Sequence, residues 1–239
     1  MEERGVKAEI RWLVLKYEPT ALFSLKLSAA TSSVGTSLVL PTPYAIKMAF
    51  VDAAFRAGLP EAECAVLVRA LRDVDVRIKP PQEAVVTHTF VKVRQESRQA
   101  DPDHPYTSNI AYREVVFFSG QQSWAFDASG SATLHMRLVD LAPLVTYIGK
   151  RGSFLQFVGW EWREQLDGSF TQPLANGPWQ IPARCHVRAL DDFGPEATLE
   201  RLSSYSPQKV ERGRHRIFVD TLIPLGVVNA GPGFSHYTG

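Results

Sequence analysis

The sequence predicts an α+β fold, and three features carry that prediction. The first is a strand near the N-terminus, residues 6–17, in which apolar and charged side chains alternate. The second is a pair of helical patterns that follows it. The third is the last part of the chain, residues 163–239, which contains only short runs bounded by Pro or Gly and is therefore expected to be mostly β.

The first strand, VKAEIRWLVLKY, alternates as far as Arg11, and Leu13 and Leu15 then make its end apolar on both sides. This pattern is typical of a central strand in a sheet with one face covered by helices. A short second run is predicted over residues 22–27, and the small polar residues 28–36 predict a flexible loop.

The next segment predicts a buried helix that begins after Thr42 and ends before Gly58. Thr42 can cap the helix, Pro43 suits its first turn, and Gly58 suits a left-handed terminating position. Lys47 is an exception on an apolar helix, because a cation is unfavourable at the positive end of the helix dipole. Either an anion such as a phosphate docks there, or the lysine lies along the surface with its head in water.

The remaining predicted elements, up to residue 162, are both helices and strands. We expect a helix at 61–72, strands at 74–78 and 84–93, a hairpin tip or protrusion at 94–109, strands at 112–118 and 123–127, a helix at 134–148 bent by Pro143, and a strand at 153–162. This is the β-α-β-β-α-β order of a ferredoxin-like, RRM-like domain with an insertion at 84–111. Residues 1–162 are assigned to that domain, and residues 163–239 to a β-rich part packed on it.

The composition limits the possible functions only loosely. A net charge of +1 argues against nucleic-acid binding through a general positive field, although a local basic groove remains open. No apolar run approaches the roughly 18–20 residues that cross a bilayer. The charged start, MEERGVKAEI, lacks the apolar stretch of a signal peptide, and two cysteines without motif spacing favour a reducing cytoplasm.

Two basic clusters are candidate phosphate contacts. The turn GKRG places Lys150 and Arg151 between two glycines, either as a phosphate site or as an ordinary solvated turn. Lys92, Arg94 and Arg98 punctuate the strand and protrusion after Val91, which suits either a ribbon along a nucleic-acid backbone or a solvated edge strand. A third cluster, KVERGRHR at 209–216, is interpreted as a charged hairpin turn at residues 212–213.

Other site chemistries are not supported by the sequence. The C-terminal GVVNAGPGF is neither a Walker A motif nor a GxGxxG loop before a helix, so no nucleotide cofactor is predicted. No HxxxH, CxxC or carboxylate cluster indicates a metal. His88 and His135 are isolated in the sequence and are assigned to core or surface roles, and Asp191–Asp192 is assigned to a turn.

Three motifs, in order, resemble the CRISPR-associated Cas-five family. They are LPTPYAIKMAF, which is similar to a Pro-x-Pro turn leading into a first helix; YREVVFFSGQQSWAF, which resembles an Arg-Glu strand followed by a paired strand; and LVDLAPLVTYIGKRGSF, which resembles a helix ending in a Gly-Lys turn. The resemblance covers roughly residues 6–160. It implies a RAMP-type ferredoxin-like domain with an inserted β-hairpin thumb at about residues 84–113.

The resemblance also implies a function. Members of this family are RNA-binding subunits of Cascade-type type I surveillance complexes, which hold the five-prime handle of the CRISPR RNA. The implied partners are the CRISPR RNA, the backbone RAMP subunits, the large subunit and target DNA near the PAM. The residues implied to contact RNA are Tyr44, Lys47, Lys92, Arg94, Arg98, Arg113, Lys150 and Arg151.

Two alternatives to this noncatalytic role remain open from the sequence. One branch of the family cuts precursor RNA with a Tyr/Lys/His set, and Tyr44 and Lys47 fit part of such a set, although no His stands beside a Lys at a matching place. A metal-independent endoribonuclease is therefore the alternative function. The other alternative is a ferredoxin-like scaffold without an RNA role.

Overall fold

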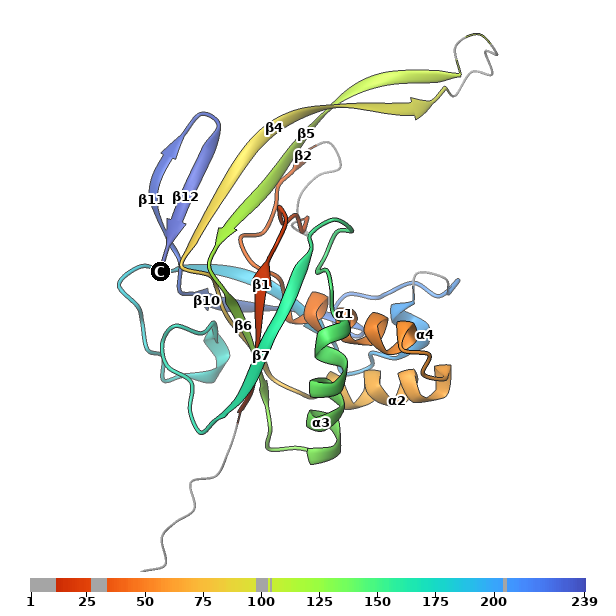
Figure 1. The fold of residues 1–239 in the computed structure, drawn as a ribbon, viewed down its shortest axis with the longest axis vertical. Coiled ribbons are helices and arrows are strands. Elements are labelled where there is room, and N and C mark those ends of the chain that lie inside the picture. The colour runs from red at the N-terminus through yellow and green to blue at the C-terminus, as the bar shows by residue number, and fades with distance from the viewer. Residues whose placement is uncertain (1–11, 27–33, 98–102, 104, 204–205) are drawn as a thin grey trace, which may run out of the picture.

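The computed structural model describes residues 12–26, 34–97, 103, 105–203 and 206–239. Within these residues the protein is α+β, and its strands form a four-stranded, a three-stranded and a five-stranded sheet (Figure 1). The helices are α1 (Pro43–Arg56), α2 (Glu61–Arg72), α3 (Ala132–Leu141), α4 (Leu199–Leu202) and the 3₁₀ turns η1 (Ala142–Leu144) and η2 (Leu174–Asn176). The strands are β1 (Trp12–Pro19), β2 (Val34–Gly35), β3 (Val76–Lys79), β4 (Glu83–Glu96), β5 (Tyr106–Ser119), β6 (Gln122–Asp127), β7 (Leu155–Arg163), β8 (Gln172–Pro173), β9 (His186–Phe193), β10 (Arg216–Ile223), β11 (Gly226–Gly231) and β12 (Phe234–Thr238).

The four-stranded sheet has the order β3-β6-β1-β7 with antiparallel pairing throughout. Along the chain, its strands and the helices α1–α2 and α3 follow the predicted β-α-β-β-α-β order. Leu13 and Leu15 of β1 are buried in one core with Ile46 and Phe50 of α1, because the same face of the sheet is covered by helices (Figure 1). The prediction of a central strand covered by helices is confirmed for residues 12–17; residues 6–11 lie outside the described part.

The local signals around α1 are confirmed. The Thr42 hydroxyl accepts a hydrogen bond from the Ala45 backbone N–H at 3.2 Å, as an N-cap does. Gly58 follows the helix with φ +81°, a conformation that a side chain would make unfavourable. The second helix, α2, begins and ends where the sequence predicts.

Three predicted elements are wrong in detail. α3 ends at Leu141 and gives way to η1, because Pro143 lacks an N–H and its ring would clash with the carbonyl of the preceding turn. The run 22–26 contains no strand; Phe23 and Lys26 form only isolated bridges, and residue 27 lies outside the described part. Within the predicted loop 28–36, residues 28–33 lie outside the described part and Val34–Gly35 forms β2, which pairs parallel with β5.

β4 and β5 form a long hairpin that extends away from the rest of the molecule (Figure 1). Their pairing runs without a register shift from Glu83 opposite Ser119 to Glu96 opposite Tyr106. The predicted protrusion at 94–109 is thereby confirmed for residues 94–96 and 106–109, whereas residues 98–102 and 104 lie outside the described part. The expectation that the strand with the Arg-Glu motif pairs with the next strand is wrong: Gly120, with φ +91°, redirects the chain, and β6 pairs with β1 and β3 instead.

The last part of the chain is mostly β, as predicted, and it contacts both the core and the hairpin. β8, β10 and β9 form a sheet of their own, and Leu190 and Phe193 of β9 join the core that contains α1. The glycine-rich tail forms the hairpin β11–β12, and β12 pairs with β4. No helix among the described residues is long and apolar enough to cross a membrane.

Candidate functional site

A groove of about 370 Å³ brings together pieces of chain that are far apart in the sequence. Tyr44 at the start of α1, Gly149 at the start of the GKRG turn, and Asp191 and Arg216 on β9 and β10 all line it. Two predicted candidates, Tyr44 and the basic turn, are therefore neighbours. The contribution of the C-terminal strands was not predicted.

Tyr44 and Arg216 form a stacked pair at this groove. The guanidinium carbon of Arg216 lies 4.6 Å from the centroid of the Tyr44 ring, and Phe193 meets the same ring edge-on at 5.3 Å. The Arg216 Nε donates to Asp191 Oδ2 at 2.6 Å. Burial raises the pKa of the Tyr44 phenol, with an opposing effect of Arg216, so the hydroxyl is a neutral donor at physiological pH.

The GKRG turn presents two exposed cations beside the groove. Gly149 and Gly152 have φ values of +75° and +98°, which explains why glycines stand at both ends of the turn. The Ser153 N–H donates to the Lys150 carbonyl at 3.1 Å, and the Lys150 N–H donates to the Ser24 carbonyl at 3.3 Å. Lys150 and Arg151 themselves are exposed, so the turn geometry suits a phosphate contact.

One face of the β4–β5 hairpin, here called the hairpin face, carries aromatic and basic side chains together. Its members lie two residues apart on β4 or opposite them on β5, and they are His88, Phe90, Lys92, Arg94, Ser108, Ile110, Tyr112 and Glu114. Phe90 is 74% exposed and Ile110 is 77% exposed. The Tyr112 ring lies 5.5 Å from that of Phe90 and 5.8 Å from that of His88, so the three rings form a row.

The other predicted residues of the hairpin are placed differently. Arg113 lies opposite Thr89, on the face away from Tyr112, and its Nη1 donates to the Tyr112 carbonyl at 3.0 Å. Lys92 and Arg94 are exposed on the hairpin face. Arg98 lies outside the described residues.

A polar network fixes the base of the hairpin. The buried carboxylate of Glu114 accepts the Ser37 N–H at 2.7 Å and lies 3.0 Å from His88 Nδ1, which is 2.5 Å from the Tyr112 hydroxyl. Burial, followed by the charge of Glu114, raises the pKa of Tyr112. His88 is therefore not isolated, contrary to the prediction. The sequence missed this cluster because Tyr112 and Glu114 are 24 or more residues away from His88 and Ser37 along the chain.

The hairpin base and the groove are joined through residues 23–25. The Ser24 hydroxyl donates to the Glu114 carbonyl at 3.4 Å, and the Ser24 N–H donates to the Ser153 hydroxyl at 3.1 Å. The next residue, Leu25, lines the groove. The hairpin face, the GKRG turn and the groove thus lie along one connected part of the molecule.

Lys47 does not contact solvent, and both interpretations of it from the sequence are wrong. Its side chain is fully buried, and its ammonium lies 2.8 Å from Asp192 Oδ1 and 3.4 Å from the Arg72 carbonyl. Phe193 also lies beneath it, at 5.5 Å. A phosphate cannot reach this ammonium in the observed structure, because the counter-ion comes from β9.

The pair Asp191–Asp192 is likewise not a turn. Both residues lie within β9, where Asp191 pairs with Arg216 and Asp192 with Lys47. Burial raises the pKa of Asp192, and the Lys47 charge opposes that effect. Neighbouring positions on a strand point to opposite faces, so the two carboxylates serve separate cations.

The basic cluster at 209–216 forms a turn, with Gly213 at φ +88°, but not the predicted hairpin turn, because β10 pairs with β8 and β9 and no strand among the described residues directly precedes the turn. Most of its charge is paired locally. Arg214 contacts Glu196 and Glu211, and burial is absent, so this network adds little to stability. His135 bonds two backbone carbonyls, of Ser131 and Asp127, which agrees with the predicted structural role.

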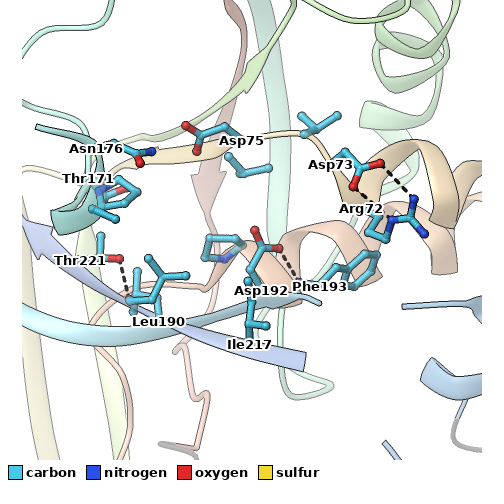
Figure 2. A pocket seen from close by; sticks show the side chains of 16 residues that line it. Arg72, Asp73, Asp75, Thr171, Asn176, Leu190, Asp192, Phe193, Ile217 and Thr221 are labelled. Atoms are coloured by element: carbon cyan, nitrogen blue, oxygen red, sulfur yellow. Dashed lines mark hydrogen bonds and ion pairs between the residues drawn. The ribbon is translucent and has the colours of Figure 1, made fainter. Parts of the chain in front are cut away.

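A second cavity, of about 360 Å³, has acidic walls (Figure 2). Asp73 and Asp75 lie on one side of it, and Asp192 lies on the other with Leu190 and Ile217 of the three-stranded sheet. Carboxylates on both walls disfavour a phosphate ligand. Among the described residues, no group of three or more His, Cys, Asp or Glu side chains is arranged to hold a metal ion.

Comparison with known proteins supports the resemblance found in the motifs. No protein-family model matches the sequence. The chain is 28% identical over 109 residues to the CRISPR-associated protein Cas5 of Archaeoglobus fulgidus. The match covers 46% of this chain and 48% of that relative, so it spans about half the length of each. The predicted resemblance is confirmed, because the chain is similar to Cas5 over the matched residues.

Three solved structures are also similar in part. A chain of a type III-B Cmr-beta complex bound to cognate target RNA gives a TM-score of 0.49 at 9% identity, covering 64% of this chain and 61% of that one. A CRISPR protein from Archaeoglobus fulgidus gives 0.45 at 10% identity, with coverage of 96% and 92%. A chain of a CRISPR RNA-guided surveillance complex gives 0.42 at 13% identity, with coverage of 89% and 91%.

Proposed function

We propose that this protein is a noncatalytic RNA-binding subunit of a Cascade-type CRISPR complex, in which it holds the five-prime handle of the CRISPR RNA. The homology to Cas5 suggests the class of complex. The observation that carries the RNA-binding role is the hairpin face, where the exposed ring of Phe90, the half-buried ring of Tyr112 and the cations Lys92 and Arg94 lie on one side of a projecting ribbon.

The chemistry of that face suits a single strand better than a duplex. Unpaired bases stack on aromatic rings, and each such contact contributes about 1–3 kcal/mol regardless of base identity. Phe90 and Tyr112 are 5.5 Å apart and supply the rings. The exposed cations Lys150 and Arg151 lie further along the same connected region and would bind phosphates. The near-neutral net charge of +1 fits such a local footprint.

The same proposal assigns the parts of the molecule. Residues 1–162 would be a ferredoxin-like RAMP domain, the β4–β5 hairpin its thumb, and residues 163–239 a β-rich part packed on it. The backbone RAMP subunits, the large subunit and target DNA near the PAM are proposed as further contacts, in the cytoplasm. Tyr44, Lys92, Arg94, Arg98, Arg113, Lys150 and Arg151 remain proposed RNA contacts, whereas Lys47 does not.

Copurification tests this role. Protein expressed with its own CRISPR locus should carry a discrete small RNA. Phe90→Ala should weaken binding of the purified protein to that RNA by roughly 5- to 100-fold, because one stacking ring is lost. Val91→Ala is the matched control, since Val91 is exposed on the opposite face of the same strand. A complex without RNA, or equal loss in both variants, would exclude the proposal.

The second candidate function is a metal-independent endoribonuclease, and the His88–Tyr112–Glu114 cluster is the observation that favours it. An imidazole next to a carboxylate and a phenol can exchange protons with a ribose hydroxyl. Labelled repeat RNA incubated with pure protein and EDTA separates the two functions. A specific cut that is lost in Tyr44→Phe or His88→Ala would establish the enzyme, and intact RNA would support the noncatalytic subunit.

A further inference from the structure

Arg216 has one hydrogen-bonding edge occupied and one open. Asp191 Oδ2 accepts from Nε at 2.6 Å and also contacts Nη2, so the carboxylate takes up the Nε side of the guanidinium. Among the described residues, no protein group accepts a hydrogen bond from Nη1. The outer edge of the fork is therefore available to a ligand in the groove, which Arg216 lines.

The position of this fork is fixed before any ligand arrives. Asp191 is only 5% exposed. The guanidinium carbon lies 4.6 Å from the centroid of the Tyr44 ring and 5.7 Å from that of Phe218. A planar cation held by a buried carboxylate and two rings loses little conformational entropy on binding, so its hydrogen bonds can discriminate between ligands.

Apart from Thr42 and Asp52, the remaining side chains of the groove are suited to a flat ligand with apolar faces. Leu25, Ala45, Met48 and Ala49 contribute aliphatic surface, and Tyr147 contributes a second ring. Its volume of about 370 Å³ leaves room for a single planar base. A phosphate would leave this apolar surface uncovered and would lose hydration, whereas a nucleobase would cover it.

We propose that the groove binds one guanine base of the single-stranded RNA, with the open edge of Arg216 donating to O6 and N7. This inference rests on the proposed function. Guanine has two acceptors side by side on that edge, whereas adenine places a donor beside N7 and pyrimidines have no N7. The hairpin face would bind any base by stacking. The groove, through Arg216, would add a preference for guanine.

Fluorescence anisotropy with labelled single-stranded RNA tests the preference directly. The probes are a uridine decamer and the same decamer with one central guanosine, adenosine or 7-deazaguanosine. The guanosine probe should bind roughly 5- to 100-fold more tightly than the adenosine probe. The 7-deazaguanosine probe should lose much of that advantage, because it lacks only the N7 acceptor.

Variants identify the residue responsible. Arg216→Lys keeps the charge but loses the fork, so the guanosine probe should bind it no more tightly than the adenosine probe does. Arg212→Lys is the matched control, because Arg212 lies over the Phe218 ring at 4.3 Å but does not line the groove. If Arg216→Lys does not fold, the 7-deazaguanosine comparison on the unaltered protein decides alone.

The outcomes separate this inference from the proposed function. If all the probes bind with equal affinity, or if Arg216→Lys keeps the preference, the guanine site is excluded while RNA binding stands. If Arg212→Lys removes the preference as well, the effect is not specific to the Arg216 guanidinium and the site is also excluded. If no probe binds, both the site and the proposed function are excluded.

Discussion

Lys47 and the Lys150–Arg151 turn look alike in the sequence, yet they lie in opposite environments. The sequence predicts each of them beside a helix terminus and makes each a candidate phosphate contact, although α3 in fact ends at Leu141, well before the turn. Lys47 is fully buried against Asp192, 145 positions further along the chain, whereas Lys150 and Arg151 are exposed at a glycine-bounded turn. The comparison teaches that a basic residue in a sequence motif does not by itself identify a phosphate contact, because the fold decides whether a carboxylate of the same chain neutralises the cation or leaves it exposed.

The largest expected effect concerns the buried pair. Lys47→Met leaves Asp192 without its counter-ion and should reduce the free energy of unfolding by about 3 kcal/mol or more. The double variant with Asp192→Leu should recover much of that loss, because no uncompensated charge remains. Denaturant unfolding followed by circular dichroism measures both.

RNA affinity provides the contrast for this pair. The folded fraction of Lys47→Met should bind RNA as the unaltered protein does, since the ammonium is not accessible. If Lys47→Met has normal stability but no longer binds RNA, Lys47 is an RNA contact and does not differ in role from Lys150 and Arg151.

The second effect concerns the exposed turn. Lys150→Ala with Arg151→Ala should leave the free energy of unfolding within about 0.5 kcal/mol of the original value, because both side chains are solvated. The slope of log affinity against log salt should decrease by about 1.4, the value for two phosphates of a single strand. Titration at several salt concentrations measures it.

A pair of exposed cations elsewhere controls for general charge. Arg69 and Lys209 are exposed and do not line the groove. Arg69→Ala with Lys209→Ala should keep the original salt slope. An equal decrease in both double variants would show that the turn acts only through the overall charge.

The smallest expected effect concerns the partly exposed ion pair between Lys16 and Glu161, which should contribute less to stability than the buried pair of Lys47 and Asp192. Hydrogen bonds from Lys16, and then from Arg163, lower the pKa of Glu161 below its usual value of 4.5. Because the folded-state pKa is the lower one, this stabilisation is present above pH 4.5 and is lost as the pH falls through the folded-state value. Because the side chains of Lys16 and Glu161 are both 32% exposed, the stabilisation from this pair amounts to about 1 kcal/mol or less.

Glu161→Gln tests this. The variant should lose up to that amount at pH 7, and its stability should match that of the unaltered protein near pH 2. Thermal unfolding across this pH range is the measurement. A loss as large as that of Lys47→Met would contradict the role assigned to burial.

The sequence predicted well those features that local residues determine. Thr42 and Gly58 delimit α1 through hydrogen bonds and dihedral angles within a few positions, and the glycines of the GKRG turn act in the same way. Pro143 was identified as a disturbance, but whether it bends or ends a helix depends on the packing of the following residues, so α3 was predicted too long.

The residues of the candidate site also differ in whether local sequence or tertiary packing places them. The positions of Tyr44 and the basic turn follow from their own helix and turn, and both were found. Arg216 and Asp191 were missed because they reach the groove only through the packing of β9 and β10 on α1, and no motif marks them. The row of rings on the hairpin face could have been found from the alternation in β4, had its register with β5 been worked out.

By itself, the sequence determined the order of strands and helices, the ends of α1, the glycine turn and the projecting hairpin, because these depend on contacts between near neighbours. The tertiary structure alone decided that Lys47 is neutralised, that Asp191 directs Arg216 over Tyr44, and that Glu114 fixes the hairpin base. Those outcomes depend on which distant side chain is brought within 3–5 Å of a charge or ring. For Lys47 and Arg216 that distance is set by the packing of the C-terminal strands on the core, and for Glu114 by the pairing of β4 with β5 and by the contact with Ser37.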